Sequence, residues 1–195
     1  MTEERILSEI TLRRDELVSL CQDLVRIPTL NPPGRLYREI CDYVGARLAA
    51  KGFKVEFIRA HGAPGDSDTW PRWNVLARHE GTRPGECVHF NSHHDVVEVG
   101  HGWTRDPFGG ELDAGRIYGR GACDMKGGLA ASIIAAEAFI AACPDYAGAI
   151  EISARPSMIS SIATNRPMTQ PQARSHSSWP SGVASASAPG GITVP

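Results

Sequence analysis

The chain has 195 residues, of which 42% are hydrophobic and 22% are charged, and its formal net charge is -2. These values are typical of a globular domain with its own core, and the acidic balance argues against nucleic acid or anionic lipid as a partner. No apolar run approaches the roughly 20 residues that span a bilayer, so we expect no membrane segment. The charged N-terminal segment lacks the apolar centre of a secretory signal, which predicts a cytoplasmic protein.

Hydrophobic periodicity predicts helices and strands that alternate along the chain. Apolar residues at helical spacing predict helices over 3–26 and 36–51, and the prolines of IPTLNPPG end the first of them. Strands are expected at 53–58, 73–78, 86–92 and 149–153. Asp113, Ala114 and Gly115 predict the turn of a hairpin. The segment 125–143 is apolar nearly all round and predicts a buried helix, so the pattern indicates a layered α/β domain.

The composition changes after Ser153. From 154 to 195 there is no Asp, Glu, Lys or Leu, and Ser, Pro, Ala and Arg dominate. Such a segment buries too little apolar surface to offset the entropy of ordering it, so we predict a domain over 1–153 and a low-complexity, disordered tail over 154–195. One hypothesis for the tail is a change of reading frame near Ser153. The other is a truncated paralogue whose tail has drifted, and the DNA sequence after codon 153 decides between them.

An H-x-D pattern follows the expected strand 86–92. This strand delivers His93, His94 and Asp95 to its C-terminal end, where ligand sites of α/β sheets lie. In an extended segment His93 and Asp95 point the same way. An imidazole that binds a metal often donates its other N–H to a carboxylate, so the pattern fits a metal ligand with its orienting partner. The alternative is a polar turn at the end of a strand.

A second carboxylate, Asp124, lies in the Gly-rich segment GRGACDMKGG just before the buried helix. It could bridge two divalent ions, or it could simply cap the helix. A phosphate loop is disfavoured because Lys126 is followed by Gly127 rather than Ser or Thr. A dinucleotide fingerprint is disfavoured as well, because Asp124 stands where the third glycine would be.

Three segments together are far more specific than either cluster alone. LVRIPTLNPPG, HHDVV and GWTRDPFGGELDAGRIYGRGACDMKGG, in this order and spacing, resemble the acetylornithine deacetylase / succinyl-diaminopimelate desuccinylase family of two-metal amidohydrolases and peptidases. The resemblance covers about 17–153. It implies an incomplete three-layer α/β/α sandwich of zinc-peptidase type, the N-terminal part of a catalytic domain without the family's dimerisation domain. It also implies hydrolysis of an N-acyl amino acid or short peptide by two zinc or cobalt ions.

The same resemblance assigns roles to three residues. His93 matches a ligand of one metal, Asp124 matches the carboxylate that bridges both metals, and Asp95 matches the catalytic carboxylate that orients His93. His94 receives no role, and 103–108 matches a loop that we interpret as structural. The resemblance assigns no substrate-binding residue.

Two glutamates that the family places after the strand 149–153, a general base and a metal ligand, have no counterpart here. Met158 and Ile159 lie near the expected positions. A catalytic zinc normally has three protein ligands, and loss of a general base costs a factor of ~10²–10⁴ in rate. We therefore expect an amidohydrolase by family whose present chain has little or no activity. The alternative is a non-catalytic fragment or pseudoenzyme that binds a partner through an exposed sheet edge and apolar face.

Overall fold

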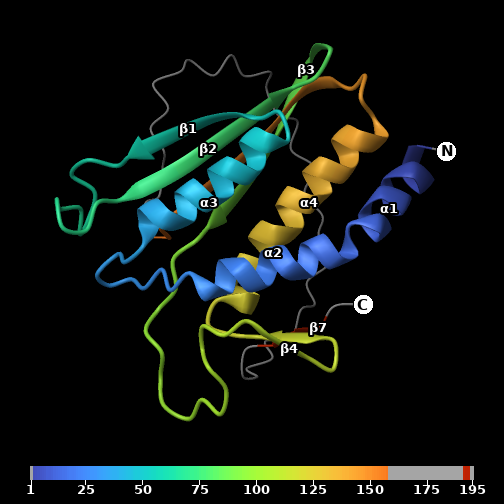
Figure 1. Cartoon of the computed structure of the whole chain (residues 1–195). Coiled ribbons are helices and arrows are strands. Elements are labelled where there is room, and N and C mark those ends of the chain that lie inside the picture. Colours follow the sequence, from blue (N-terminus) through green and yellow to red (C-terminus); the bar gives the residue numbers. More distant parts are fainter. Residues whose placement is uncertain (1, 158–190, 194–195) are drawn as a thin grey trace, which may run out of the picture.

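The computed structural model describes residues 2–157 and 191–193, which form a mixed sheet covered by helices (Figure 1). In chain order the elements are α1 (Thr2–Leu12), α2 (Arg14–Arg26), α3 (Tyr37–Ala50), β1 (Lys54–Arg59), β2 (Trp73–Glu80), β3 (Arg83–His93), β4 (Glu111–Asp113), β5 (Arg116–Tyr118), η1 (Ala122–Lys126), α4 (Gly127–Ala142), β6 (Ala147–Arg155) and β7 (Gly191–Thr193). The expected α/β fold class is confirmed.

The main sheet has the strand order β1-β2-β6-β3. The pairs β1/β2 and β2/β6 are antiparallel, whereas β3 and β6 run parallel. The chain returns from β3 to β6 through α4, as a parallel pair requires. The C-terminal ends of β3 and β6 therefore meet at one edge of the sheet, where His93 is the register partner of Arg155.

One face of this sheet packs against the helices. Ile150, Ile152 and Ala154 of β6 belong to the buried core, together with Leu129 and Ile133 of α4. Because side chains alternate along a strand, these three residues of β6 share one face. The prediction of a buried, apolar helix before β6 is confirmed, since eight residues of α4 are buried.

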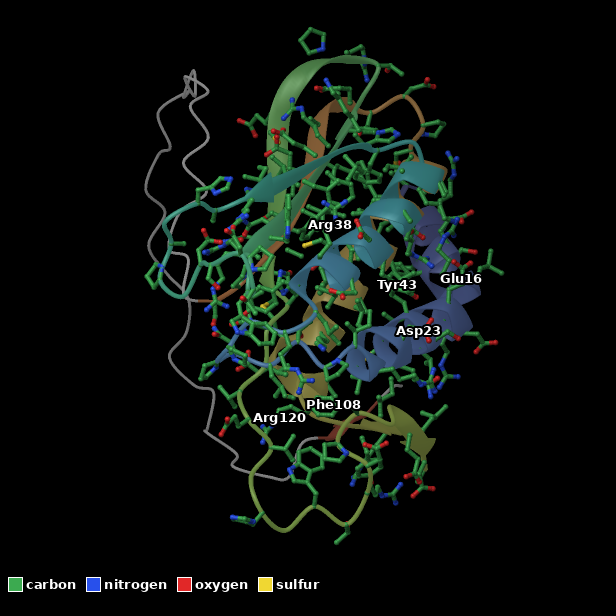
Figure 2. The ribbon with its side chains drawn as sticks, turned by 60° about the vertical axis from the view of Figure 1, so that its left-hand side comes forward. Glu16, Asp23, Arg38, Tyr43, Phe108 and Arg120 are labelled. Carbon is green, nitrogen blue, oxygen red and sulfur yellow. The ribbon has the colours of Figure 1, made fainter. Side chains whose placement is uncertain are left out.

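The opposite face of the sheet is polar. Arg78 Nη1 donates to Glu151 Oε1 at 2.8 Å, His89 Nε2 lies 2.9 Å from Ser153 Oγ, and Arg155 also projects from this face of β6. Within 2–157, no helix packs on it, as Figure 2 shows. The expectation of an apolar face is therefore wrong. Of the three layers of an α/β/α sandwich, the described residues form the sheet and one helical layer.

The expected helix over 3–26 is two helices. At Arg13 the backbone turns out of helical geometry (φ -97°, ψ 12°), and its N–H donates to Ile10 O at 3.1 Å. The Arg13 guanidinium donates instead to the carbonyl oxygen of Glu9 at 2.9 Å. A side chain thus takes the hydrogen bond that would have continued the helix, a competition that periodicity does not reveal.

The predicted hairpin is confirmed, with β4 and β5 joined by Ala114 and Gly115. Both residues have positive φ, 46° and 75°, as a two-residue hairpin turn requires. The segment predicted as a tail is described in part. Residues 154–155 continue β6, and Gly191–Thr193 pairs with β5 as β7. Residues 158–190 and 194–195 lie outside the described residues, so the predicted disorder there stays a prediction.

One helical stretch, Ala122–Ala142, is long and apolar enough to cross a membrane by length and composition. Half of its most apolar window is buried inside the domain. Glu137 within it is also buried and accepts hydrogen bonds from Arg47 at 2.8 and 2.9 Å. The stretch therefore packs as a core helix of the described domain.

The central position of β6 in the sheet predicts that truncation of its buried side chains lowers the free energy of unfolding. Ile152 is fully buried, so Ile152→Ala leaves a cavity and should lower the free energy of unfolding by about 2–5 kcal/mol. Leu112→Ala, at a position that is 47% exposed, is the matched control and should cost less than about 1 kcal/mol. Urea unfolding followed by circular dichroism measures both. Equal losses in the two variants would contradict this placement of the core.

Candidate metal centre

The fold brings His93, Asp95 and Asp124 together at the C-terminal edge of the sheet. His93 ends β3, and Asp124 lies in η1 just before α4. Gly121 permits the turn into η1, because it has φ 83° and a Cβ there would lie 2.4 Å from Val96 Cγ1. The site therefore combines a strand end with a tight Gly-rich turn, two segments 31 residues apart in sequence.

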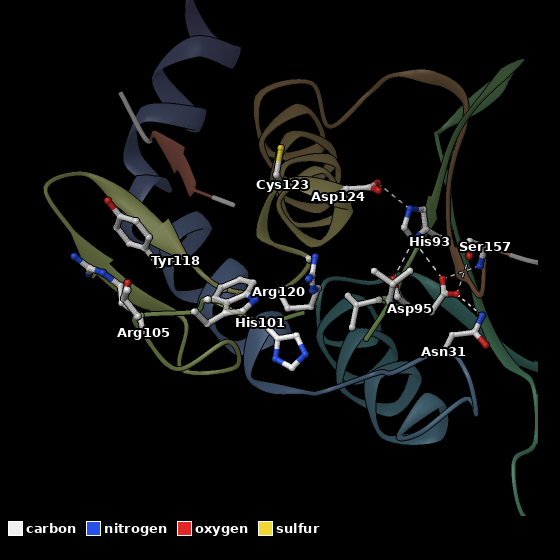
Figure 3. A pocket seen from close by; sticks show the side chains of 17 residues that line it. Asn31, His93, Asp95, His101, Arg105, Tyr118, Arg120, Cys123, Asp124 and Ser157 are labelled. Atoms are coloured by element: carbon white, nitrogen blue, oxygen red, sulfur yellow. Dashed lines mark hydrogen bonds and ion pairs between the residues drawn. The ribbon is translucent and has the colours of Figure 1, made fainter. Parts of the chain in front are cut away.

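His93 and Asp124 contact each other directly (Figure 3). His93 Nε2 lies 3.0 Å from Asp124 Oδ1, and the Asp124 side chain is 87% exposed. The helix-capping interpretation of Asp124 is wrong. The N-cap residue of α4 is Lys126, and the backbone of Asp124 leaves helical geometry (φ -127°, ψ 98°). Its carboxylate is thus directed at an imidazole rather than at the start of the helix.

Asp95 lies behind His93 and is surrounded by donors. Its Oδ1 accepts from the backbone N–H of Ser157 at 2.7 Å and lies 3.3 Å from His93 Nδ1. Its Oδ2 accepts from Asn31 Nδ2 and Ser157 Oγ, each at 2.8 Å. Burial by itself would raise the pKa of Asp95, but the hydrogen bonds from His93, Asn31 and Ser157 outweigh it and lower the pKa. The carboxylate is therefore ionised and fixed in place.

The imidazole of His93 is held between these two carboxylates. The hydrogen bond to Asp95, followed by the one to Asp124, raises the pKa of His93 to about 9 against the opposing effect of burial. Because Asp95 engages Nδ1, the Nε2 atom is directed at Asp124. A carboxylate that engages one ring nitrogen and leaves the other directed at a shared point is the arrangement found in metal-binding histidines.

A neighbouring loop fixes the strand end from the other side. Thr29 Oγ1 donates to the carbonyl oxygen of His94 at 2.5 Å, and the N–H of Val96 donates to Thr29 O at 2.9 Å. The buried Lys126 Nζ donates to Ile27 O at 2.6 Å, and burial lowers the pKa of this amine to about 7. The loop after α2 is thereby tied both to the H-x-D segment and to η1.

The sequence did not predict Asn31 and Ser157 as residues of this site. Asn31 lies in the segment that was interpreted only as the end of a helix, and Ser157 lies in the predicted tail. The order of LNPPG before HHDVV was the one signal for Asn31, because it belonged to the family pattern. Sequence contained no signal for Ser157, whose role depends on the register of β6 against β3.

His94 points away from this site. It is fully buried and packs edge-on against Tyr37, with ring centroids 4.9 Å apart. Its Nε2 lies 3.2 Å from the carbonyl oxygen of Trp73, and burial lowers its pKa to about 4. His94 is thus a neutral imidazole within the core, which fits the alternation of side chains along the strand end.

A cavity of about 780 Å³ opens in front of His93 and Asp124. Its opposite wall comes from the loop after Val97 and from the hairpin, and includes Trp103, Arg105 and Arg120. This volume is in the range of small-molecule sites. The paired donor atoms thus face a space large enough for a small molecule.

The donor pair fits a shared divalent ion in type and spacing. Two ligand atoms bound at about 2.0–2.2 Å to one tetrahedral zinc ion lie about 3.3–3.6 Å apart. His93 Nε2 and Asp124 Oδ1 are 3.0 Å apart, so they need to separate by only a few tenths of an ångström to share one ion. The set is incomplete, however. Within the described residues, no group of three or more His, Cys, Asp or Glu side chains could hold a metal, and a catalytic zinc normally has three protein ligands.

The different surroundings of the two carboxylates yield a prediction. In Asp95→Asn the amide nitrogen faces an N–H donor whichever way it turns, the Ser157 backbone on one side or Asn31 Nδ2 on the other, so the free energy of unfolding should fall by about 2–3 kcal/mol. Asp124→Asn, at the exposed carboxylate, is the matched control and should leave stability nearly unchanged. Urea unfolding compares the two. A larger loss in Asp124→Asn than in Asp95→Asn would contradict the structural role of Asp95.

Comparison with known proteins places this arrangement in a family. Residues 89–157 match the model of Peptidase family M20/M25/M40. The chain is 38% identical over 135 residues to a succinyl-diaminopimelate desuccinylase of Burkholderia vietnamiensis. The aligned region is 68% of this chain and 33% of that protein. A desuccinylase of Burkholderia cenocepacia is also 38% identical, over 137 residues. The chain spans about a third of the length of these curated relatives.

Solved structures agree with this placement. Human carnosine dipeptidase 1 is 26% identical, with a TM-score of 0.65 over 78% of this chain and 34% of that chain. A di-peptidase from Saccharomyces cerevisiae, 19% identical, shares the fold with a TM-score of 0.66 over the same fractions. The predicted family and the incomplete sandwich are both confirmed. The chain belongs to Peptidase family M20/M25/M40 and carries the N-terminal part of its catalytic domain.

Proposed function

We propose that this chain carries the first part of the active site of a metal-dependent hydrolase of linear amide bonds. The proposed substrates are N-acyl amino acids or short peptides, and the proposed ligands of zinc or cobalt are His93 and Asp124. The observation that supports this most is the 3.0 Å approach of His93 Nε2 to Asp124 Oδ1 at the edge of a large cavity. The similarity to desuccinylases over 68% of the chain supports the reaction class.

Each residue of the centre then has a distinct task. Asp95 holds the ring of His93 through Nδ1 and directs Nε2 at Asp124, where a cation would take the place of a proton, while Asn31 and Ser157 keep Asp95 in place. Asp124 offers an exposed carboxylate that two cations could share. Divalent ions bound there would supply Lewis-acid activation of the amide carbonyl and of the attacking water.

We also propose that these 195 residues alone turn over little or no substrate. The sequence contains no Asp or Glu after Glu151, so the carboxylate base expected after β6 is absent from this chain. Two donors shared between two cations are too few for a complete centre. If both activity and metal binding prove absent, the alternative of a non-catalytic fragment remains. The cytoplasmic location stays a prediction.

Metal binding tests the proposed ligands. The chain should bind Zn²⁺ or Co²⁺ weakly, and His93→Ala should lower the affinity at least about tenfold, because even the loss of a residue that only orients a metal ligand costs about 10–100-fold. His61→Ala, which removes an exposed histidine outside the cavity, is the matched control and should bind as the unmodified chain does. Equilibrium dialysis with atomic emission measures the bound metal. Equal binding by all three proteins would overturn the assignment.

Turnover tests the proposed lack of a base. With zinc or cobalt added, the chain should release amine from N-acetyl and N-succinyl amino acids at least about 10²-fold more slowly than a full-length desuccinylase of the family. Fluorescamine detection of the amine provides the rate. A rate close to that of the full-length enzyme, lost in His93→Ala, would show that the centre is complete without the missing glutamate.

A further inference from the structure

The cavity contains one cation that has no anionic partner. Arg120 lies between Gly119 and Gly121 on the wall of the cavity, and Figure 3 shows its side chain projecting into that space. Among the described residues it forms no ion pair, and its Nε atom is buried without a hydrogen-bond partner. Because no protein acceptor within the described part of the chain contacts the rest of its guanidinium either, the donors that face the cavity are available to water or to a bound acceptor.

Arg120 is nevertheless held in position. Its backbone N–H donates to Pro107 O at 2.6 Å, and its guanidinium carbon lies 5.4 Å from the centroid of the Trp103 ring. Stacking on an aromatic face restricts a guanidinium while leaving the donor edge free. The side chain is thus oriented by groups that do not use its hydrogen-bonding capacity.

The other arginine of the same cavity shows the contrast. Arg105 donates to Glu111 Oε1 at 2.5 Å and to Asp113 Oδ2 at 2.7 Å, and it lies 4.0 Å from the centroid of the Tyr118 ring. Its charge is therefore neutralised within the hairpin. Of the two arginines, only Arg120 has a guanidinium available to a bound molecule.

We propose that Arg120 binds a carboxylate of the substrate and so restricts the site to acyl amino acids or peptides that carry a free carboxylate. This inference rests on the proposed hydrolase function and adds a specificity residue to it. Arg120 and the His93–Asp124 pair line one cavity, so a molecule whose carboxylate binds the guanidinium has the rest of its atoms in the space that the proposed metal ligands face. The planar fork of arginine matches a carboxylate with two parallel hydrogen bonds.

A pair of probes isolates the carboxylate. N-acetyl-L-alanine and N-acetyl-L-alaninamide differ only in a carboxylate against a neutral amide, and their affinities can be measured by NMR titration of the full chain with EDTA present. The chain should bind the carboxylate probe at least about tenfold more tightly, as expected for hydrogen bonds between charged groups. Arg120→Gln should abolish this preference. Arg120→Lys, which keeps the charge but not the fork, should retain part of it.

Arg105→Gln is the matched control, because it removes a neutralised arginine from the same cavity, and it should keep the full preference. Urea unfolding of each variant checks that it is folded. The proposal is overturned if the unmodified chain binds both probes equally or binds neither, or if Arg120→Gln keeps the preference. EDTA removes metal from this assay, so the assay is independent of the metal-binding test with His93→Ala. A negative result for Arg120 would not affect the conclusion on metal binding, and a negative result for metal binding would not affect the conclusion on Arg120.

Discussion

The arrangement of the site depends on the carboxylate of Asp95. Its two oxygens accept from Asn31, from Ser157 twice, and from His93. These donors come from the loop after α2, the end of β6 and the end of β3. One buried charge therefore ties three segments together, and the orientation of the His93 ring follows from it. Such a charge is tolerated because hydrogen bonds surround it on every side.

Asp95 and Asp124 are the same residue type, but their different surroundings suit them to different roles. Asp95 is buried and its hydrogen-bonding capacity is used within the protein. Asp124 is exposed, and among the described residues its carboxylate has one partner, His93. The first is suited to holding a ligand in place, and the second is suited to being one. The parallel pairing of β3 with β6, together with the turn at Gly121, brings them to opposite sides of a single imidazole.

The cavity combines two walls of different chemistry. Donor atoms for a cation lie on the sheet edge and η1, and cationic and aromatic side chains lie on the loop and hairpin opposite.

Beyond the cavity, the second face of the main sheet carries ion pairs and hydrogen bonds such as Arg78–Glu151. This polar face argues against an apolar association surface there, even though only one helical layer is described.

The sequence by itself determined the helices and strands with strong periodicity, the hairpin turn and the family, because these depend on local spacing and on motifs. It also predicted that His93 and Asp124 converge, and the two side chains are in contact. It failed at Arg13, where a side chain takes a hydrogen bond within the helix in a way that periodicity does not reveal, and on the polarity of the second sheet face. Only the tertiary structure decided that Asn31 and Ser157 support Asp95 and that Arg120 rather than Arg105 has free donors. The physical reason is that a hydrogen bond requires two groups to lie within about 3 Å of each other. Strand register and loop packing decide which groups, distant in sequence, come that close.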